Sequence, residues 1–117
     1  MSTLTIYEKP TCTTCRKLHA LLTELGVDFR SIDYHTTGIS ESELRELLRK
    51  MRCNPREILR VREPLVEELR LEEAGVFDDE LIAQMSANPA LLQRPIAVHG
   101  DRALLARPIE QVFELIR

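Results

Sequence analysis

The sequence has no tryptophan, and aromatic residues make up only 4% of its 117 positions. Proteins that bind single-stranded nucleic acid stack the bases on aromatic side chains, so this composition argues against that class of function. The net charge of -3 gives no general attraction to nucleic acid or to anionic membranes. We therefore expect no nucleic-acid partner.

Long hydrophobic runs are absent as well, since no apolar stretch approaches the roughly 20 residues of a transmembrane helix. Residues 1–6 lack the basic and apolar regions of a signal peptide. The chain has only three cysteines, and an odd number argues against the disulfide framework of a secreted protein. We expect a cytoplasmic monomer with no membrane partner, in which a Cys-x-x-Cys motif is catalytic or metal-binding.

The N-terminal third contains the pattern of a strand, a helix and a second strand. Leu4 and Ile6 alternate with polar residues, as in a half-buried strand. Leucines spaced at i, i+3, i+4 and i+7 predict a helix over residues 18–25, and Gly26 is suited to end it. Residues 27–34 are predicted to form the next strand, which makes a βαβ unit.

The rest of the chain is first helical and then changes period. Capping patterns predict helices after Ser40, Asn54 and Asp78. Residues 96–99 and 102–106 predict a hairpin, which is followed by a helix. This order predicts an α/β, thioredoxin-like fold with a four-stranded mixed sheet. We expect one domain over residues 1–117, with a helical insertion at about residues 40–93 between the βαβ unit and the C-terminal ββα unit.

Cys12 is the candidate nucleophile, because it lies between the first predicted strand and its helix. Unpaired N–H groups and the positive end of the helix dipole favour a thiolate at such a position. Motifs of this kind lower a thiol pKa from about 8.5 to roughly 3.5–7.5. Lys9, Arg16 and Lys17 add positive potential, whereas Glu8 opposes it.

Cys15 lies three residues further on the same helix face, and the pattern leaves its role open. It is either a resolving thiol or a small helix residue without a redox role. A zinc site is a weaker alternative: Cys12, Cys15 and His19 share a face, but a structural zinc needs four ligands, usually in two separated pairs. Cys53 has no such partner, and we interpret it as a small buried residue. We predict no metal and no bound cofactor.

Three arginines lie in special sequence contexts. Arg60 ends a short apolar helix, while Arg94 and Arg107 directly precede prolines at either end of the predicted hairpin. The guanidinium group carries a permanent charge and a planar fork that suits oxyanions. Several arginines around a thiolate would bind an anionic substrate, although spacing alone does not single out these three.

Taken together, the motifs closely resemble those of the glutaredoxin-coupled arsenate reductase family, which also includes the Spx-type regulators. The resemblance covers residues 3–117. It is carried by Thr5-Ile6-Tyr7, Pro10, Cys12, Arg16, Leu59-Arg60, Glu63-Pro64, Glu67-Glu68-Leu69, Asn88-Pro89, Leu91-Leu92, Arg94-Pro95-Ile96 and Ala106-Arg107-Pro108.

The resemblance implies a reaction and a set of residues. Cys12 would attack arsenate, and Arg60, Arg94 and Arg107 would hold the oxyanion. Glutathione would add to the adduct as a co-substrate, and glutaredoxin would complete the reduction to arsenite. The resemblance also implies a cis peptide bond before Pro95.

Two positions depart from the family pattern and keep two alternatives open. The reductases tend to carry histidine where this chain has Glu8, and they commonly carry serine where it has Cys15. The Cys-x-x-Cys motif is similar to that of the Spx-type regulators, which implies a redox-switched protein that binds RNA polymerase. That branch generally lacks the arginine at the position of Arg107. A general thiol–disulfide reductase that uses both cysteines is the other alternative.

Overall fold

The computed structural model describes residues 3–116, which form two compact units. The first unit combines the chain before residue 38 with the chain after residue 93, and the second is Gly38–Gln93. The predicted insertion at about residues 40–93 therefore corresponds to the second unit, within two residues at its start. None of the helices in the described part of the chain is both long and apolar enough to cross a lipid bilayer.

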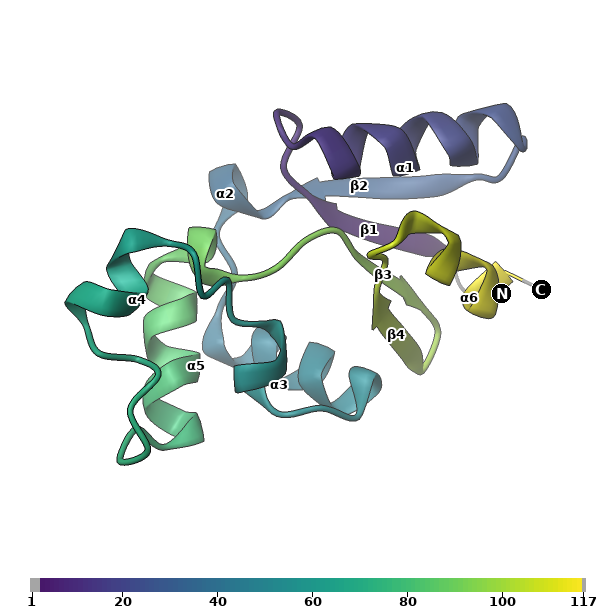
Figure 1. Cartoon of the computed structure of the whole chain (residues 1–117). Helices are drawn as coiled ribbons and strands as arrows, with labels where there is room; N and C mark the ends of the chain where they lie inside the picture. Colours follow the sequence, from purple (N-terminus) through teal and green to yellow (C-terminus); the bar gives the residue numbers. More distant parts are fainter. Residues whose placement is uncertain (1–2, 117) are drawn as a thin grey trace. The chain divides into compact units, whose positions relative to one another are not determined.

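The first unit contains a four-stranded mixed sheet, which confirms the predicted fold class (Figure 1). Its strand order is β2-β1-β3-β4. β1 pairs in parallel with β2 and antiparallel with β3, which pairs antiparallel with β4. The bounds are β1 (Leu4–Glu8), β2 (Phe29–Asp33), β3 (Ile96–His99) and β4 (Arg102–Leu105). β2 is shorter than predicted because Tyr34 already begins the short helix α2 (Tyr34–Thr37).

Helix α1 (Thr13–Glu24) and the C-terminal turns η3 (Ile109–Val112) and α6 (Phe113–Ile116) share one core with the sheet. The buried members of this core are Leu4, Ile6, Leu18, Leu22, Ala97, Ala106, Val112 and Leu115. They come from strands and helices alike, so burying these side chains stabilises the packing of α1 on β1. That packing fixes where the first turn of α1 lies.

The end of α1 follows from Gly26, as predicted. Gly26 has φ 69°, its N–H donates to the Thr23 carbonyl (3.1 Å), and the Val27 N–H donates to the Leu22 carbonyl (3.0 Å). This is a Schellman motif, and glycine is preferred there because it adopts positive φ without steric cost. Leu25, which the leucine spacing assigned to the buried face, is 50% exposed because the helix has ended by that residue.

The second unit is helical, with α3 (Glu41–Met51), η1 (Pro55–Ile58), α4 (Pro64–Glu68), α5 (Asp78–Ala87) and η2 (Pro89–Leu91). Ser40 caps α3 by accepting a hydrogen bond from the Glu43 N–H (3.0 Å), as predicted. Asp78 is the first residue of α5 and not its cap, because the carbonyl of Phe77 accepts the Leu81 N–H.

Arg56 links η1 to the loop that precedes α5. Its guanidinium donates to the carbonyl groups of Leu71 (3.3 Å), Glu73 (2.9 Å) and Val76 (2.7 Å). Hydrogen bonds that involve a charged group contribute about 1.5–3 kcal/mol. We expect Arg56→Met to lower the free energy of unfolding by about 2 kcal/mol, measured by urea denaturation. Arg49→Met is the control, because its ion pair with Glu46 is exposed and its loss should cost less than about 0.5 kcal/mol.

Candidate active site

Cys12 lies where β1 has ended and α1 begins. Its backbone is extended, its N–H donates to the Lys9 carbonyl (2.9 Å), and its own carbonyl accepts the Arg16 N–H (3.0 Å). Cys12 is therefore the N-cap of α1. The first turn of the helix carries no acidic residue, so its N–H groups and dipole act on the Cys12 sulfur.

The pKa of the Cys12 thiol is lowered, although several influences oppose one another. Partial burial is the largest influence and acts to raise the pKa. Hydrogen bonds from the backbone N–H and the thiol of Cys15, and the guanidinium of Arg94, outweigh it and lower the pKa. The balance favours the thiolate, which is the nucleophilic form of cysteine.

The pKa of the Cys15 thiol, in contrast, is raised. Its side chain is completely buried in the first turn of α1. Burial raises the pKa of the Cys15 thiol to about 12, helped by the charges of Cys12 and Glu8 and opposed by a hydrogen bond from the Lys9 backbone N–H. The structure thus pairs a thiolate-favouring Cys12 with a protonated Cys15. The two cysteines and Cys53 are all free thiols.

Arg94 lies close enough to Cys12 for its guanidinium group to help lower the pKa of the Cys12 thiol. The residue is only 7% exposed. Its Nε and Nη1 atoms are buried and have no hydrogen-bond partner among residues 3–116. An unpaired buried guanidinium costs free energy, and planar N–H donors of this kind are the groups that bind oxyanions. Arg94 and Cys12 together therefore suit a tetrahedral oxyanion next to the thiolate.

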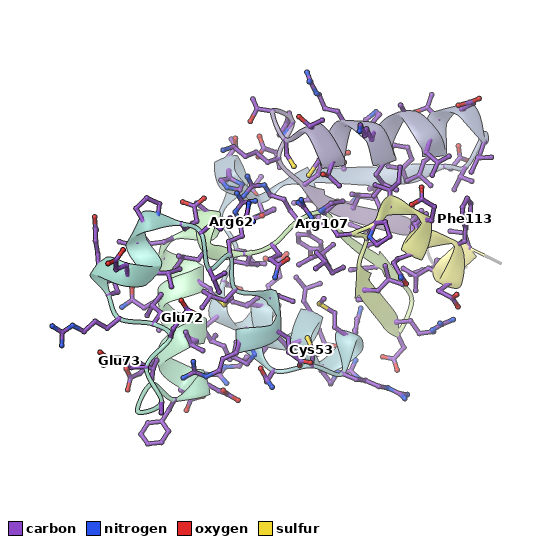
Figure 2. All side chains as sticks on the ribbon, viewed as in Figure 1. Cys53, Arg62, Glu72, Glu73, Arg107 and Phe113 are labelled. Carbon is purple, nitrogen blue, oxygen red and sulfur yellow. The ribbon has the colours of Figure 1, made fainter. Side chains whose placement is uncertain are left out.

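Arg107 joins the same part of the first unit (Figure 2). Its Nη1 atom donates to the backbone carbonyl of Arg94 (3.2 Å). The peptide bond before Pro95 is cis, which confirms that prediction, and the bond between Arg107 and Pro108 is cis as well. The Pro95 carbonyl accepts the Ala106 N–H (2.9 Å), so the segments that carry the two arginines are tied together.

Arg60 lies in the second unit. Its N–H donates to the Leu91 carbonyl (2.7 Å), and its side-chain Nε is 3.4 Å from a Glu63 carboxylate oxygen. Its role in binding the oxyanion stays a prediction. Arg16 is exposed on α1, and its supporting role also stays a prediction.

Cys53 is also in the second unit (Figure 2). It is only partly buried, whereas we interpreted it as a small buried residue. Burial, and to a smaller extent the charge of Glu57, raise the pKa of the Cys53 thiol. Because it is held as the neutral thiol, Cys53 is a poor nucleophile.

Glu8 is the residue whose place the sequence reasoning missed. We treated it only as a charge opposed to the Cys12 thiolate. It is in fact 5% exposed, and a carboxylate oxygen lies 3.6 Å from Nδ1 of His19. The signal was present in the alternation of β1, because Glu8 follows Leu4 and Ile6 on the face that the pattern buries.

The zinc alternative has no geometric support. Within residues 3–116, no group of three or more histidine, cysteine, aspartate or glutamate side chains converges in a way that could hold a metal ion. Structural zinc needs four such ligands. Cys12, Cys15 and His19, which the spacing placed on one helix face, do not form such a group.

The thiol pKa values predict how the cysteines react with iodoacetamide. We expect Cys12 to be alkylated first, with a rate that reaches half of its maximum at a pH below the value of about 8.5 for an ordinary cysteine. Cys15 should stay unmodified at neutral pH, because it is buried and its pKa is about 12. Peptide mass spectrometry after timed alkylation measures both rates, and faster labelling of Cys15 or Cys53 would contradict the assignment.

Comparisons with known proteins show the family to which this chain is similar. The ArsC family model matches residues 7–115. The Escherichia coli K12 protein named "Uncharacterized protein YfgD" is 38% identical over 112 residues, covering 95% of this chain and 94% of that protein. An Escherichia coli arsenate reductase is 36% identical over 116 residues, covering 99% of this chain and 82% of that protein.

Solved structures give the same answer for the fold. The structure of an arsenate reductase from Vibrio cholerae matches with a TM-score of 0.93 and 36% sequence identity. The match covers 97% of this chain and 98% of that one. The fold of this chain is therefore shared with a protein that is 36% identical to it.

Proposed function

Because this chain belongs to the ArsC family, we propose that it reduces arsenate to arsenite through an adduct on Cys12. The observation that carries the proposal is the pairing of a thiolate-favouring Cys12 with the buried, unsatisfied guanidinium of Arg94. A nucleophile and an anion-binding cation thus lie side by side. This is what attack on a negatively charged oxyanion requires.

The first step forms a bond between sulfur and arsenic. The Cys12 thiolate attacks arsenate, and one arsenate oxygen leaves as water after protonation. Arg94 neutralises part of the oxyanion charge, and Arg107 supports it through its hydrogen bond to the Arg94 backbone. N–H groups at the start of α1 add positive potential at the reacting sulfur.

The second step supplies the two electrons that convert arsenate to arsenite. We propose glutathione as the co-substrate that attacks the adduct and glutaredoxin as the partner that completes the reduction. Two thiols are oxidised to one disulfide for each arsenite released. The reaction consumes reduced thiols, so we expect it in the reducing cytoplasm, carried out by a monomer.

Omission of single components tests the proposal. Purified protein is incubated with arsenate, glutathione, glutaredoxin, glutathione reductase and NADPH, and NADPH consumption is followed with arsenite measured directly. We expect arsenite formation that needs this protein and arsenate, and that falls by at least about 10-fold without glutaredoxin. Arsenite formation at the background rate in the complete mixture would overturn the proposal. Turnover that is unchanged without glutaredoxin would overturn only the choice of partner.

A further inference from the structure

Glu8 is a carboxylate on the buried face of β1. Leu4, Ile6 and Glu8 follow one another on the same face of β1, and all three are at most 5% exposed. Leu4 and Ile6 pack in the core that includes α1. Packing alone would be served by a third apolar residue at position 8.

Two residues of α1, one turn apart, surround this carboxylate. Nδ1 of His19 lies 3.6 Å from Oε1 of Glu8. The sulfur of Cys15 accepts a hydrogen bond from the backbone N–H of Lys9, the next residue after Glu8, and it experiences the Glu8 charge. Glu8 therefore lies beside His19, and its charge acts on the Cys15 thiol.

The burial of Glu8 is not offset by strong partners. Its Oε2 atom is buried and has no hydrogen-bond partner in the described part of the chain. The neighbouring side chain of His19 is 51% exposed. Burying a carboxylate with so little compensation is costly, which points to a role other than stability.

Glu8 and His19 connect the buried side chains below them with the solvent. Glu8 and His19 line a surface groove of about 730 Å³, together with Arg16 and Thr23. A proton that reaches Glu8 can therefore leave through His19 or through water in this groove.

Cys15 needs a base if it is to react. It is completely buried, so an external thiol cannot reach it, but it lies in the first turn of α1, three residues after Cys12, and interacts with the Cys12 thiol. At neutral pH it is protonated, and only the thiolate is nucleophilic. Cys12 is the one thiol on which the Cys15 sulfur can act.

We propose that Cys15 is the resolving thiol of this site and that Glu8 is the base that takes its proton. The proposal deepens the function proposed above and rests on it for the arsenate step. When Cys12 carries a leaving group, the Cys15 sulfur attacks the Cys12 sulfur and its proton moves to Glu8, directly or through one water. The proton then leaves through His19.

The electrons balance for each leaving group. With an arsenic adduct, a bond forms between the two sulfurs and the sulfur–arsenic bond breaks. Its electron pair stays on arsenic, which leaves as arsenite. With a glutathione mixed disulfide on Cys12, glutathione leaves as the thiolate. In both cases the product is a disulfide between Cys12 and Cys15, which glutathione or glutaredoxin reduces to restore the two thiols.

The test uses oxidised glutathione and needs no arsenate. Reduced protein is mixed with oxidised glutathione at neutral pH, quenched with acid at timed intervals and analysed by intact mass. We expect the wild type to pass through a glutathione adduct to the internal disulfide, and Cys15→Ser to stop at the adduct. In Glu8→Gln we expect the adduct to accumulate and the internal disulfide to form about 100-fold more slowly. This deficit should shrink as the pH rises, because hydroxide replaces the missing base.

Matched variants separate catalysis from structure. Glu24→Gln changes an exposed carboxylate that lines the same groove and should resolve the adduct at the wild-type rate. Glu8→Leu is a second uncharged variant that continues the apolar pattern of β1, and it should be as slow as Glu8→Gln. Both Glu8 variants should melt at or above the wild-type temperature, because each removes a buried charge.

Two outcomes overturn the inference. One is a wild type that stays glutathionylated on Cys12 without forming the internal disulfide, and the other is wild-type resolution rates in both Glu8 variants. Either result leaves arsenate reduction by Cys12 and external glutathione intact. Glu8-dependent resolution in a protein that does not reduce arsenate would instead overturn the proposed function and preserve the inference.

Discussion

Replacement of Cys12 with serine is expected to abolish arsenate reduction, with a loss of at least about 1000-fold in turnover. This corresponds to about 4 kcal/mol of barrier. Serine keeps the size of the side chain and can accept the same N–H groups at the start of α1. The pKa of the Cys12 thiol is lowered, which favours the thiolate, whereas the hydroxyl of serine stays protonated. A hydroxyl also forms no redox-active bond to arsenic. The coupled NADPH assay measures the loss.

A second cysteine variant, Cys53→Ser, tests whether the loss of activity is specific to Cys12. Cys53→Ser removes a thiol whose pKa is raised by burial, in the unit that does not hold Cys12. It should keep activity within about 2-fold of the wild type, since the neutral thiol is a poor nucleophile. If Cys12→Ser retained more than a tenth of the wild-type turnover, or if Cys53→Ser lost most of it, Cys12 would not be the nucleophile.

Replacement of Arg94 with glutamine should lower kcat/KM for arsenate by about 100-fold, or about 2.7 kcal/mol. Two effects add. The substrate loses the buried donors that suit its oxyanion, and Cys12 loses a cation that lowers its pKa. The Cys12 pKa therefore rises in the variant, and less thiolate is present at neutral pH. Part of the lost activity should return as the pH is raised, because the thiol then ionises.

The measurements for Arg94→Gln are a pH profile of kcat/KM and the pH dependence of Cys12 alkylation. Arg102→Gln serves as the control, because it removes an exposed arginine from β4 in the same unit and should change neither quantity. An unchanged alkylation profile in Arg94→Gln would contradict the assigned contact with Cys12. A KM for arsenate equal to that of the wild type would contradict its part in binding the oxyanion.

The arrangement of strands and helices was predictable because it depends on local patterns. Alternation in residues 4–8, the strand-like runs 96–99 and 102–106, the leucine spacing of α1 and the glycine after it are each readable within a few residues. The errors lie at element ends. Leu25 was assigned to the buried face although the Schellman turn at Gly26 had already ended the helix there, and Asp78 was taken as a cap although the Phe77 carbonyl starts the hydrogen bonding of α5.

The state of each thiol was decided by tertiary structure, because a pKa depends on what surrounds a group in space. From the sequence alone, Cys12 was determined as the candidate nucleophile by its place between a strand and a helix. The same sequence left Cys15 open, and residue spacing by itself gave no reason to prefer Arg94 over other arginines. Only the folded chain buries Cys15, brings Arg94 across from a distant segment to the Cys12 sulfur, and places Glu8 beside the pair. The interaction of Arg94 with Cys12 joins residues far apart along the chain, and no local pattern records it.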